Sequence, residues 1–148
     1  MLDLVKSFSF REKSLWVETA IYVYLWVWYF RRVGAGLVDT SMGREETFGL
    51  LITMTIIVVI LSIFSQIVLA IISPGESDAP ADERDKLMAW RAGSHASYML
   101  GAGVFMVAIH SLVNEVPTAG VVHRLILMLV AVEILTNALQ IYYYRRGY

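Results

Sequence analysis

The sequence has no cysteine and few charged residues, and each shortage excludes a class of protein. Without cysteine the chain can form no disulfide, no thiolate metal site and no cysteine nucleophile. Charged residues make up 17% of the chain, whereas a soluble domain carries about 25%. The net charge of −1 creates no basic field that would attract nucleic acid. Since 57% of the 148 residues are hydrophobic, the composition indicates a membrane protein.

Four apolar runs dominate the chain, and each is long enough for a membrane span. A helix needs about 20 residues to cross about 30 Å of hydrocarbon. The runs occupy residues 14–33, 48–72, 94–113 and 121–144. The links "GAGLVDTSMG" and "NEVPTAG" are short, so helices adjacent in sequence should pack antiparallel. We therefore predict an all-α membrane protein whose single domain, residues 1–148, is a four-transmembrane antiparallel helical bundle.

The distribution of lysine and arginine predicts which side of the membrane each link occupies. In the four-span arrangement, eight of these residues lie on one side and four on the other. The richer side should be cytoplasmic, which places both termini in the cytoplasm. The eight residues are Lys6, Arg11, Lys13, Arg84, Lys86, Arg91, Arg145 and Arg146. No cleavable signal peptide is evident, so the first span is expected to act as the targeting signal.

The inner link between the second and third spans ends in a helix-forming segment. Asp82, Glu83 and Asp85 stand at a helix start, where the helix dipole favours anions. Apolar and basic residues then alternate through residues 84–91. We expect the third helix to extend into the cytoplasm, with this part lying at the bilayer surface.

Three charged segments beside the spans carry a resemblance to a known family. They are "SFREKSLWV" before the first span, "ADERDKL" before the third and "QIYYYRRG" near the end of the chain. In these segments the chain resembles small four-helix bacterial inner-membrane proteins of unassigned function, comparable to the family DUF2178. The resemblance implies the four-helix fold and a bacterial inner-membrane location. It implies no activity and no catalytic residue.

Polar side chains inside the predicted spans form the candidate site. A charge at the centre of a membrane helix costs about 2.5–3.5 kcal/mol, so such residues usually face the bundle interior or water. Glu133 falls near the midplane of the fourth span, and its spacing to Asn137 and Gln140 puts the three on one helix face. At a similar depth, in the cytoplasmic half, the other spans offer Glu18, Gln66, Ser97 and Tyr98.

Two interpretations of this polar level stay open. In the first, the groups form an interhelical hydrogen-bond network that fixes helix packing, at about 0.6 kcal/mol per bond. In the second, they line an inward-facing cavity that binds a small molecule or ion, with Glu133 or Glu18 as a titrating group. Both interpretations require Glu18 and Glu133 to face away from lipid.

The third span also carries a face of small residues. Gly93, Ser97 and Gly101 recur every four residues, a spacing that allows another helix to approach closely. The contact is either within the bundle or across a homodimer.

Three histidines lie near the ends of the spans: His95, His110 and His123. We expect them to contact headgroups and water. His110 and His123, with Glu115, are an alternative haem or metal site, but neither the ligand number nor the spacing is diagnostic. We therefore predict no cofactor and no metal.

The sequence contains no nucleophile–base arrangement, phosphate loop or metal-ligand spacing, so we do not expect an enzyme. It favours a non-enzymatic binding, sensor or accessory protein. The expected partners are the lipid bilayer, a membrane protein or second copy of the chain, and a small molecule. The alternative is a small proton-coupled transporter or exporter that uses Glu18 or Glu133, by analogy with small multidrug exporters of similar size.

Overall fold

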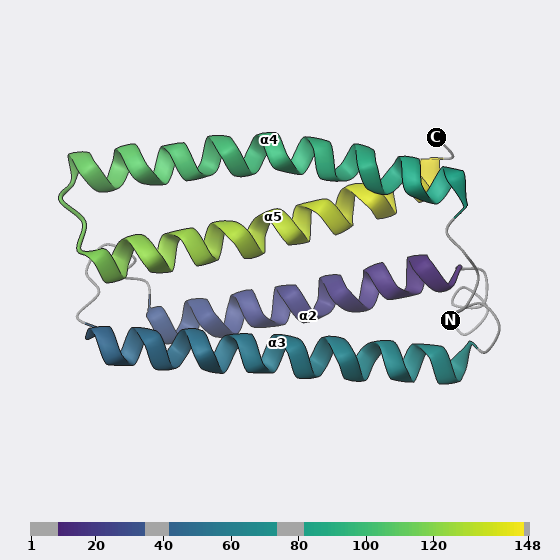
Figure 1. Ribbon diagram of the computed structural model, residues 1–148, viewed down its shortest axis with the longest axis horizontal. Helices are drawn as coiled ribbons and strands as arrows, with labels where there is room; N and C mark the ends of the chain where they lie inside the picture. The colour runs from purple at the N-terminus through teal and green to yellow at the C-terminus, as the bar shows by residue number, and fades with distance from the viewer. Residues whose placement is uncertain (1–8, 35–41, 74–81, 147–148) are drawn as a thin grey trace.

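Four helices account for nearly all of the described chain (Figure 1). The computed structural model describes residues 9–34, 42–73 and 82–146. The helices are α2 (Phe10–Val33), α3 (Arg44–Ile72), α4 (Glu83–Val113) and α5 (Thr118–Arg146). The described residues include no strand, so the predicted all-α class is confirmed. Lys6 and most of the links between α2 and α3 and between α3 and α4 lie outside the described residues.

Capping groups explain where two of the helices begin. Ser9 Oγ accepts the backbone N–H of Glu12 at 3.3 Å at the start of α2. Asp82 Oδ1 accepts the backbone N–H of Glu83 at 2.7 Å at the start of α4. Each bond satisfies one of the N–H groups that a helix start leaves without a partner. Because α4 begins at Glu83, it includes the helical extension that the sequence predicts before the third span.

The four helices form an open bundle. In Figure 1 they lie in the order α4, α5, α2, α3, and consecutive helices run in opposite directions. Extensive contacts join α4 to α5, α5 to α2 and α2 to α3. Within the described helices, α3 and α4 make no extensive contact with each other. The inner helices α2 and α5 therefore have neighbours on two sides, whereas α3 and α4 each pack mainly against one.

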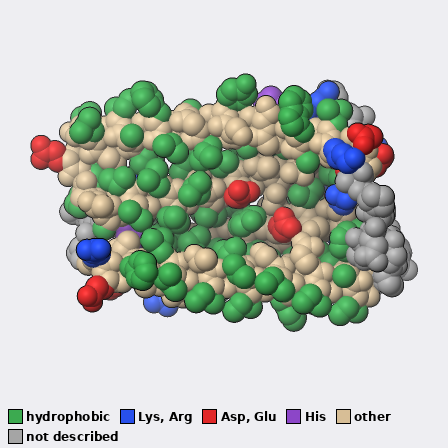
Figure 2. Space-filling model, in the orientation of Figure 1, with side chains coloured by type: hydrophobic (Ala, Val, Ile, Leu, Met, Phe, Trp, Pro, Cys, Tyr) green, Lys and Arg blue, Asp and Glu red, His purple; other side chains and the backbone are tan. Residues whose placement is uncertain are grey.

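Three of the helices, α3, α4 and α5, are long and apolar enough to cross a membrane. This confirms part of the predicted four-span architecture. The fourth, α2, is not among them, because it combines Glu18 with several Trp and Tyr residues whose polar atoms lower its hydropathy. Large apolar side chains of α3 and α4 are exposed, among them Ile60, Phe64 and Phe105, and green side chains cover much of the surface in Figure 2. Such surfaces suit contact with lipid tails, which are as apolar as leucine.

Close packing on α4 uses a different glycine from those predicted. Nothing in the rest of the described chain lies within 4 Å of a Cβ built on Gly93 or Gly101, and Ser97 is exposed. By contrast, a Cβ on Gly103 would collide with the Met128 side chain of α5. The face of Gly93, Ser97 and Gly101 therefore takes no part in packing within the described chain, and its use across a homodimer stays a prediction.

Candidate functional site

A half-buried polar cluster joins α2 to α3. Gln66 Nε2 donates to Glu18 Oε1 at 2.8 Å and to Ser14 Oγ at 2.7 Å. Ser14 Oγ lies 3.4 Å from the same carboxylate oxygen and donates to it. The structure therefore brings together two of the predicted site residues, Glu18 and Gln66. It adds Ser14, which stands one helical turn before Glu18 and whose spacing could have revealed it.

Contacts at both ends of the α2–α5 pair fix the register of these two helices. At one end the Tyr29 hydroxyl lies 2.6 Å from His123 Nδ1. At the other end Arg145 Nε lies 3.4 Å from Glu12 Oε1. Because the two helices run in opposite directions (Figure 1), each step up α2 corresponds to a step down α5.

This register sets which polar residues of α2 and α5 are neighbours. Interpolation between the two end contacts puts Asn137 at the level of Glu18, and Glu133 at the level of Tyr22. Tyr22 lies near both Glu18 and Glu133, in agreement with that register. We call Glu18, Tyr22 and Glu133 the mid-span carboxylate surface.

The residues at this level differ sharply in burial. Glu133 is exposed and Glu18 is half-buried. Asn137 is 5% exposed, and its Nδ2 finds no hydrogen-bond partner among the described residues. Figure 2 shows two acidic side chains at the surface between α5 and α2, away from both ends of the molecule. Both interpretations of the polar level required Glu133 to face away from lipid. Its exposure contradicts that requirement.

Three further predicted residues lie apart from Glu18. Ser97 is exposed and its Oγ donates to the backbone oxygen of Gly93 on its own helix. Tyr98 is 77% exposed, and both side chains line a shallow depression on α4 beside Trp90. Gln140 is half-buried on α5. The hydrogen bonds at the predicted polar level thus join residues of α2 and α3, while Ser97 and Tyr98 of α4 face outward.

A buried histidine joins three helices at the opposite end from Glu12. His123 is fully buried; its Nδ1 lies 2.6 Å from the Tyr29 hydroxyl and its Nε2 3.5 Å from Thr47 Oγ1. One neutral tautomer satisfies both contacts, with Nδ1 accepting from Tyr29 and Nε2 donating to Thr47. The expectation that His123 contacts headgroups and water is therefore wrong. Nothing in the local sequence signals this contact, because Tyr29 is distant along the chain.

The other two histidines are exposed. His110 Nδ1 lies 3.0 Å from Arg124 Nη1, whereas both ring nitrogens of His123 contact Tyr29 and Thr47. Among the described residues no group of three or more His, Cys, Asp or Glu side chains is arranged to hold a metal ion.

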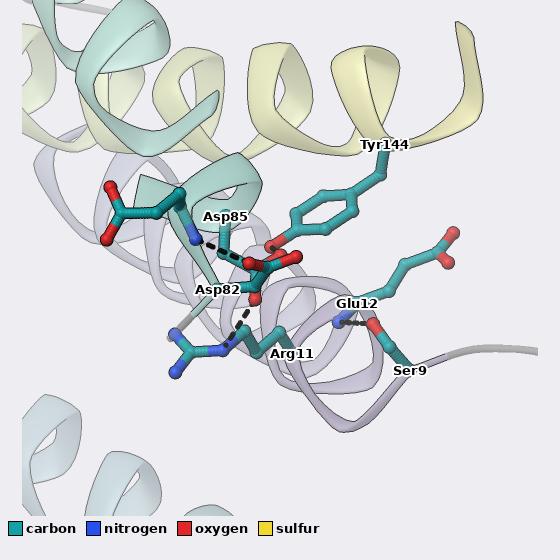
Figure 3. Close-up of polar contacts among 7 residues, drawn as sticks. Ser9, Arg11, Glu12, Asp82, Asp85 and Tyr144 are labelled. Carbon is teal, nitrogen blue, oxygen red and sulfur yellow. Dashed lines mark hydrogen bonds and ion pairs between the residues drawn. The ribbon is translucent and has the colours of Figure 1, made fainter. Parts of the chain in front are cut away.

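Charged residues tie three helix ends together where α2 and α4 begin and α5 ends (Figure 3). Arg11 Nε lies 3.1 Å from Asp85 Oδ2, and the Tyr144 hydroxyl donates to Asp85 Oδ1 at 2.6 Å. Arg145 pairs with Glu12 in the same region and lies over the Trp16 ring. The sequence predicts one side of the membrane for these basic residues, but it does not identify their partners.

Comparison with protein-family models, with curated proteins and with solved structures finds no match to this chain.

Proposed function

We propose that the chain is a four-span protein of a bacterial inner membrane, with both termini and the start of α4 in the cytoplasm. The 24 residues of α2 extend about 36 Å, enough to cross about 30 Å of hydrocarbon. This helix also packs between two span-like helices, α5 and α3. The excess of Lys and Arg at the end that holds Arg11 and Arg145 supports the orientation.

The absence of native cysteine makes this topology simple to test. In intact cells, a membrane-impermeant thiol reagent should label Thr118→Cys and leave Ser9→Cys unlabelled. Permeabilised cells should show both labelled. Labelling of Ser9→Cys in intact cells contradicts the proposed orientation.

Within the membrane, the proposed role is that of a non-enzymatic accessory subunit that docks the mid-span carboxylate surface on a helix of another membrane protein. The observation that carries this proposal is the exposure of Glu133 in the middle of a span-like helix. A carboxylate facing lipid there costs about 2.5–3.5 kcal/mol. Contact with a hydrogen-bonding partner removes much of this cost, so docking has a physical driving force.

Charge argues for a partner of different sequence over a second copy of this chain. The middle turns of the described helices carry Glu18 and Glu133 but no Lys or Arg. Two copies meeting at this surface would oppose carboxylate to carboxylate, which is unfavourable. The fitting occupant is a partner helix that carries a basic residue or a strong hydrogen-bond donor near its centre.

Photo-crosslinking inside the native membrane tests this docking. A photoreactive residue at Leu129, one turn from Glu133 on the same face, should capture a membrane protein, and one at Ile63 of α3 should not. Capture should disappear with Glu133→Leu and persist with Glu133→Asp. The site of attachment should map beside a central basic or donor residue of the partner.

Two results would contradict the docking proposal. One is equal capture with Glu133→Leu, because the carboxylate would then be irrelevant to the contact. The other is capture of lipid alone from Leu129.

A second candidate function, proton-coupled transport, rests on the Glu18 cluster. Glu18 receives hydrogen bonds from Ser14 and Gln66, and the level of exposed Glu133 lies about one helical turn away along α2. Intramembrane carboxylates are common members of proton relays. Flux driven by a pH gradient in liposomes that contain the purified chain alone would favour this function. Glu18→Gln should abolish such flux and Glu46→Gln, at the helix end, should leave it intact.

A further inference from the structure

A groove opens where α3 and α5 begin, beyond the aromatic end of α2. Its volume is about 960 Å³, and its walls include Arg44, Glu45 and Phe48 of α3 and Thr118 and Val122 of α5. Small-molecule pockets typically enclose about 300–1,000 Å³. The groove exists because α3 packs mainly on α2 and not on α5.

The chemistry of the groove changes from its rim to its interior. Arg44 and Glu45 occupy the first turn of α3 and are exposed. Phe48 and Leu51 lie one and two turns further along the same helix, and Leu51 is therefore about 10 Å from Arg44 along the axis. Val122 continues the apolar wall on α5. A charged rim above an apolar interior suits an amphiphile.

The rim offers both signs of charge without an internal ion pair. Within the described residues neither Arg44 nor Glu45 forms a salt bridge. Gly43, the N-cap of α3, makes no side-chain capping bond, so first-turn N–H groups add partial positive charge beside Arg44. A ligand that carries an anion and an amine close together complements this pair.

One wall of the groove lies against the buried His123 contact. Thr47 lines the groove, is 6% exposed and contacts His123, which contacts Tyr29 in turn. Trp26 and Phe30 stack next to this core, and Arg32 lies over Trp28. Trp and Tyr concentrate at the headgroup level of membrane proteins, so the groove opens at the depth where lipid headgroups begin.

We propose that this groove binds one glycerophospholipid with a zwitterionic aminophosphate headgroup, of the phosphoethanolamine type. The phosphate lies at Arg44 and the α3 N-terminus, the amine at Glu45, and an acyl chain follows Phe48, Leu51 and Val122. This site is separate from the mid-span carboxylate surface, and its occupancy does not depend on the docking proposed for that surface.

Native mass spectrometry of the delipidated full-length chain tests the site by titration with phospholipids that share the same acyl chains. Phosphatidylethanolamine should bind about tenfold more tightly than phosphatidylglycerol, since charged hydrogen bonds to Glu45 are lost with the amine. Arg44→Gln should weaken binding of phosphatidylethanolamine about tenfold. Glu45→Gln should remove the preference over phosphatidylglycerol.

Matched variants separate the groove from general lipid affinity. Arg31→Gln and Glu46→Gln change exposed charges near the same end of the molecule and outside the groove lining, so both should bind as the unaltered chain does. Thr118→Trp fills the groove at an exposed position and should block binding without disturbing the fold.

Four outcomes would overturn the proposal. Three of them are equal affinity for all the phospholipids, losses with Glu46→Gln as large as with Glu45→Gln, and unchanged binding in Thr118→Trp. Binding of free phosphoethanolamine as tight as that of the lipid would also overturn it, because the acyl chain would then contribute nothing.

Discussion

The His123 contact and the mid-span carboxylate surface both place polar groups in apolar surroundings. Only at His123 do side chains of the same chain supply all the hydrogen-bond partners. His123 is fully buried and each of its ring nitrogens lies near a hydroxyl group, of Tyr29 or Thr47. Glu133 is exposed in the middle of α5, and Asn137 Nδ2, one turn further on, has no partner among the described residues.

The difference separates a structural role from a binding role. A buried polar group with its hydrogen bonds made stabilises one arrangement of the helices, and removing it leaves its partners without bonds. A polar group that is exposed at mid-span contributes little to the isolated chain, and its cost in lipid is removed only by something outside the chain. Mutations at the two regions should therefore affect different measurements.

The largest expected effect on stability is that of His123→Ala. It removes a fully buried side chain and leaves the Tyr29 hydroxyl without its acceptor, so the free energy of unfolding should fall by about 3 kcal/mol. Unfolding by titration with sodium dodecyl sulfate in mixed micelles measures this change.

Glu133→Gln is the matched comparison in the same micelles. The unfolding free energy of the isolated chain should change by less than about 0.5 kcal/mol, as for surface substitutions away from structural contacts. Equal losses of unfolding free energy from the two variants would contradict the distinction between the His123 contact and the mid-span carboxylate surface.

A pair of glycines on α4 extends the comparison to packing. Gly103→Leu drives a side chain into Met128 and should lower the unfolding free energy by about 1–3 kcal/mol. Gly101→Leu meets open space and should not lower it, because leucine favours a helix more than glycine does. A stable Gly103→Leu with a destabilised Gly101→Leu would mean that the predicted small-residue face, not Gly103, packs against α5.

The sequence predicts the helices well because their ends depend on local chemistry. The predicted spans end at Val33, Ile72 and Val113, the residues where α2, α3 and α4 end. Apolar content stops at these points, and Gly34 follows the first of them with φ of 79° and ψ of 172°, a conformation that glycine adopts without the steric cost of a side chain.

Depth along a helix is also readable from the sequence, but rotation about its axis is not. Counting residues at a fixed rise puts Glu18 and Gln66 at one level, and the two side chains do form a hydrogen bond. Helix α4 is apolar on most sides, so no stripe fixes which side faces the bundle. The outward direction of Tyr98 and the open space at Gly93 could not be predicted for that reason.

The Glu18–Gln66 hydrogen bond should contribute a smaller energy than His123. A double-mutant cycle with Glu18→Ala and Gln66→Ala should give a coupling of about 0.6 kcal/mol, the average for such bonds in membranes. The same micelle titration measures it. A coupling above about 2 kcal/mol would exceed the range for membrane hydrogen bonds and would assign the cluster a structural weight similar to that of His123.

The last expected effect, of similar size, concerns the ion pairs at the helix ends, which lie in neither region. Asp85→Asn removes the charge paired with Arg11, while an amide oxygen still accepts from Tyr144. Because the Arg11 side chain is 42% exposed, the loss should be about 0.2–1 kcal/mol, and high salt should abolish the difference between the two proteins. The control is Glu83→Gln, which breaks a pair with Lys86 inside one helix at 88% exposure and should change stability less. A loss of stability at Asp85 that does not depend on salt would mean that its carboxylate is shielded from solvent, as His123 is. This end of the bundle would then belong with the His123 contact in the comparison.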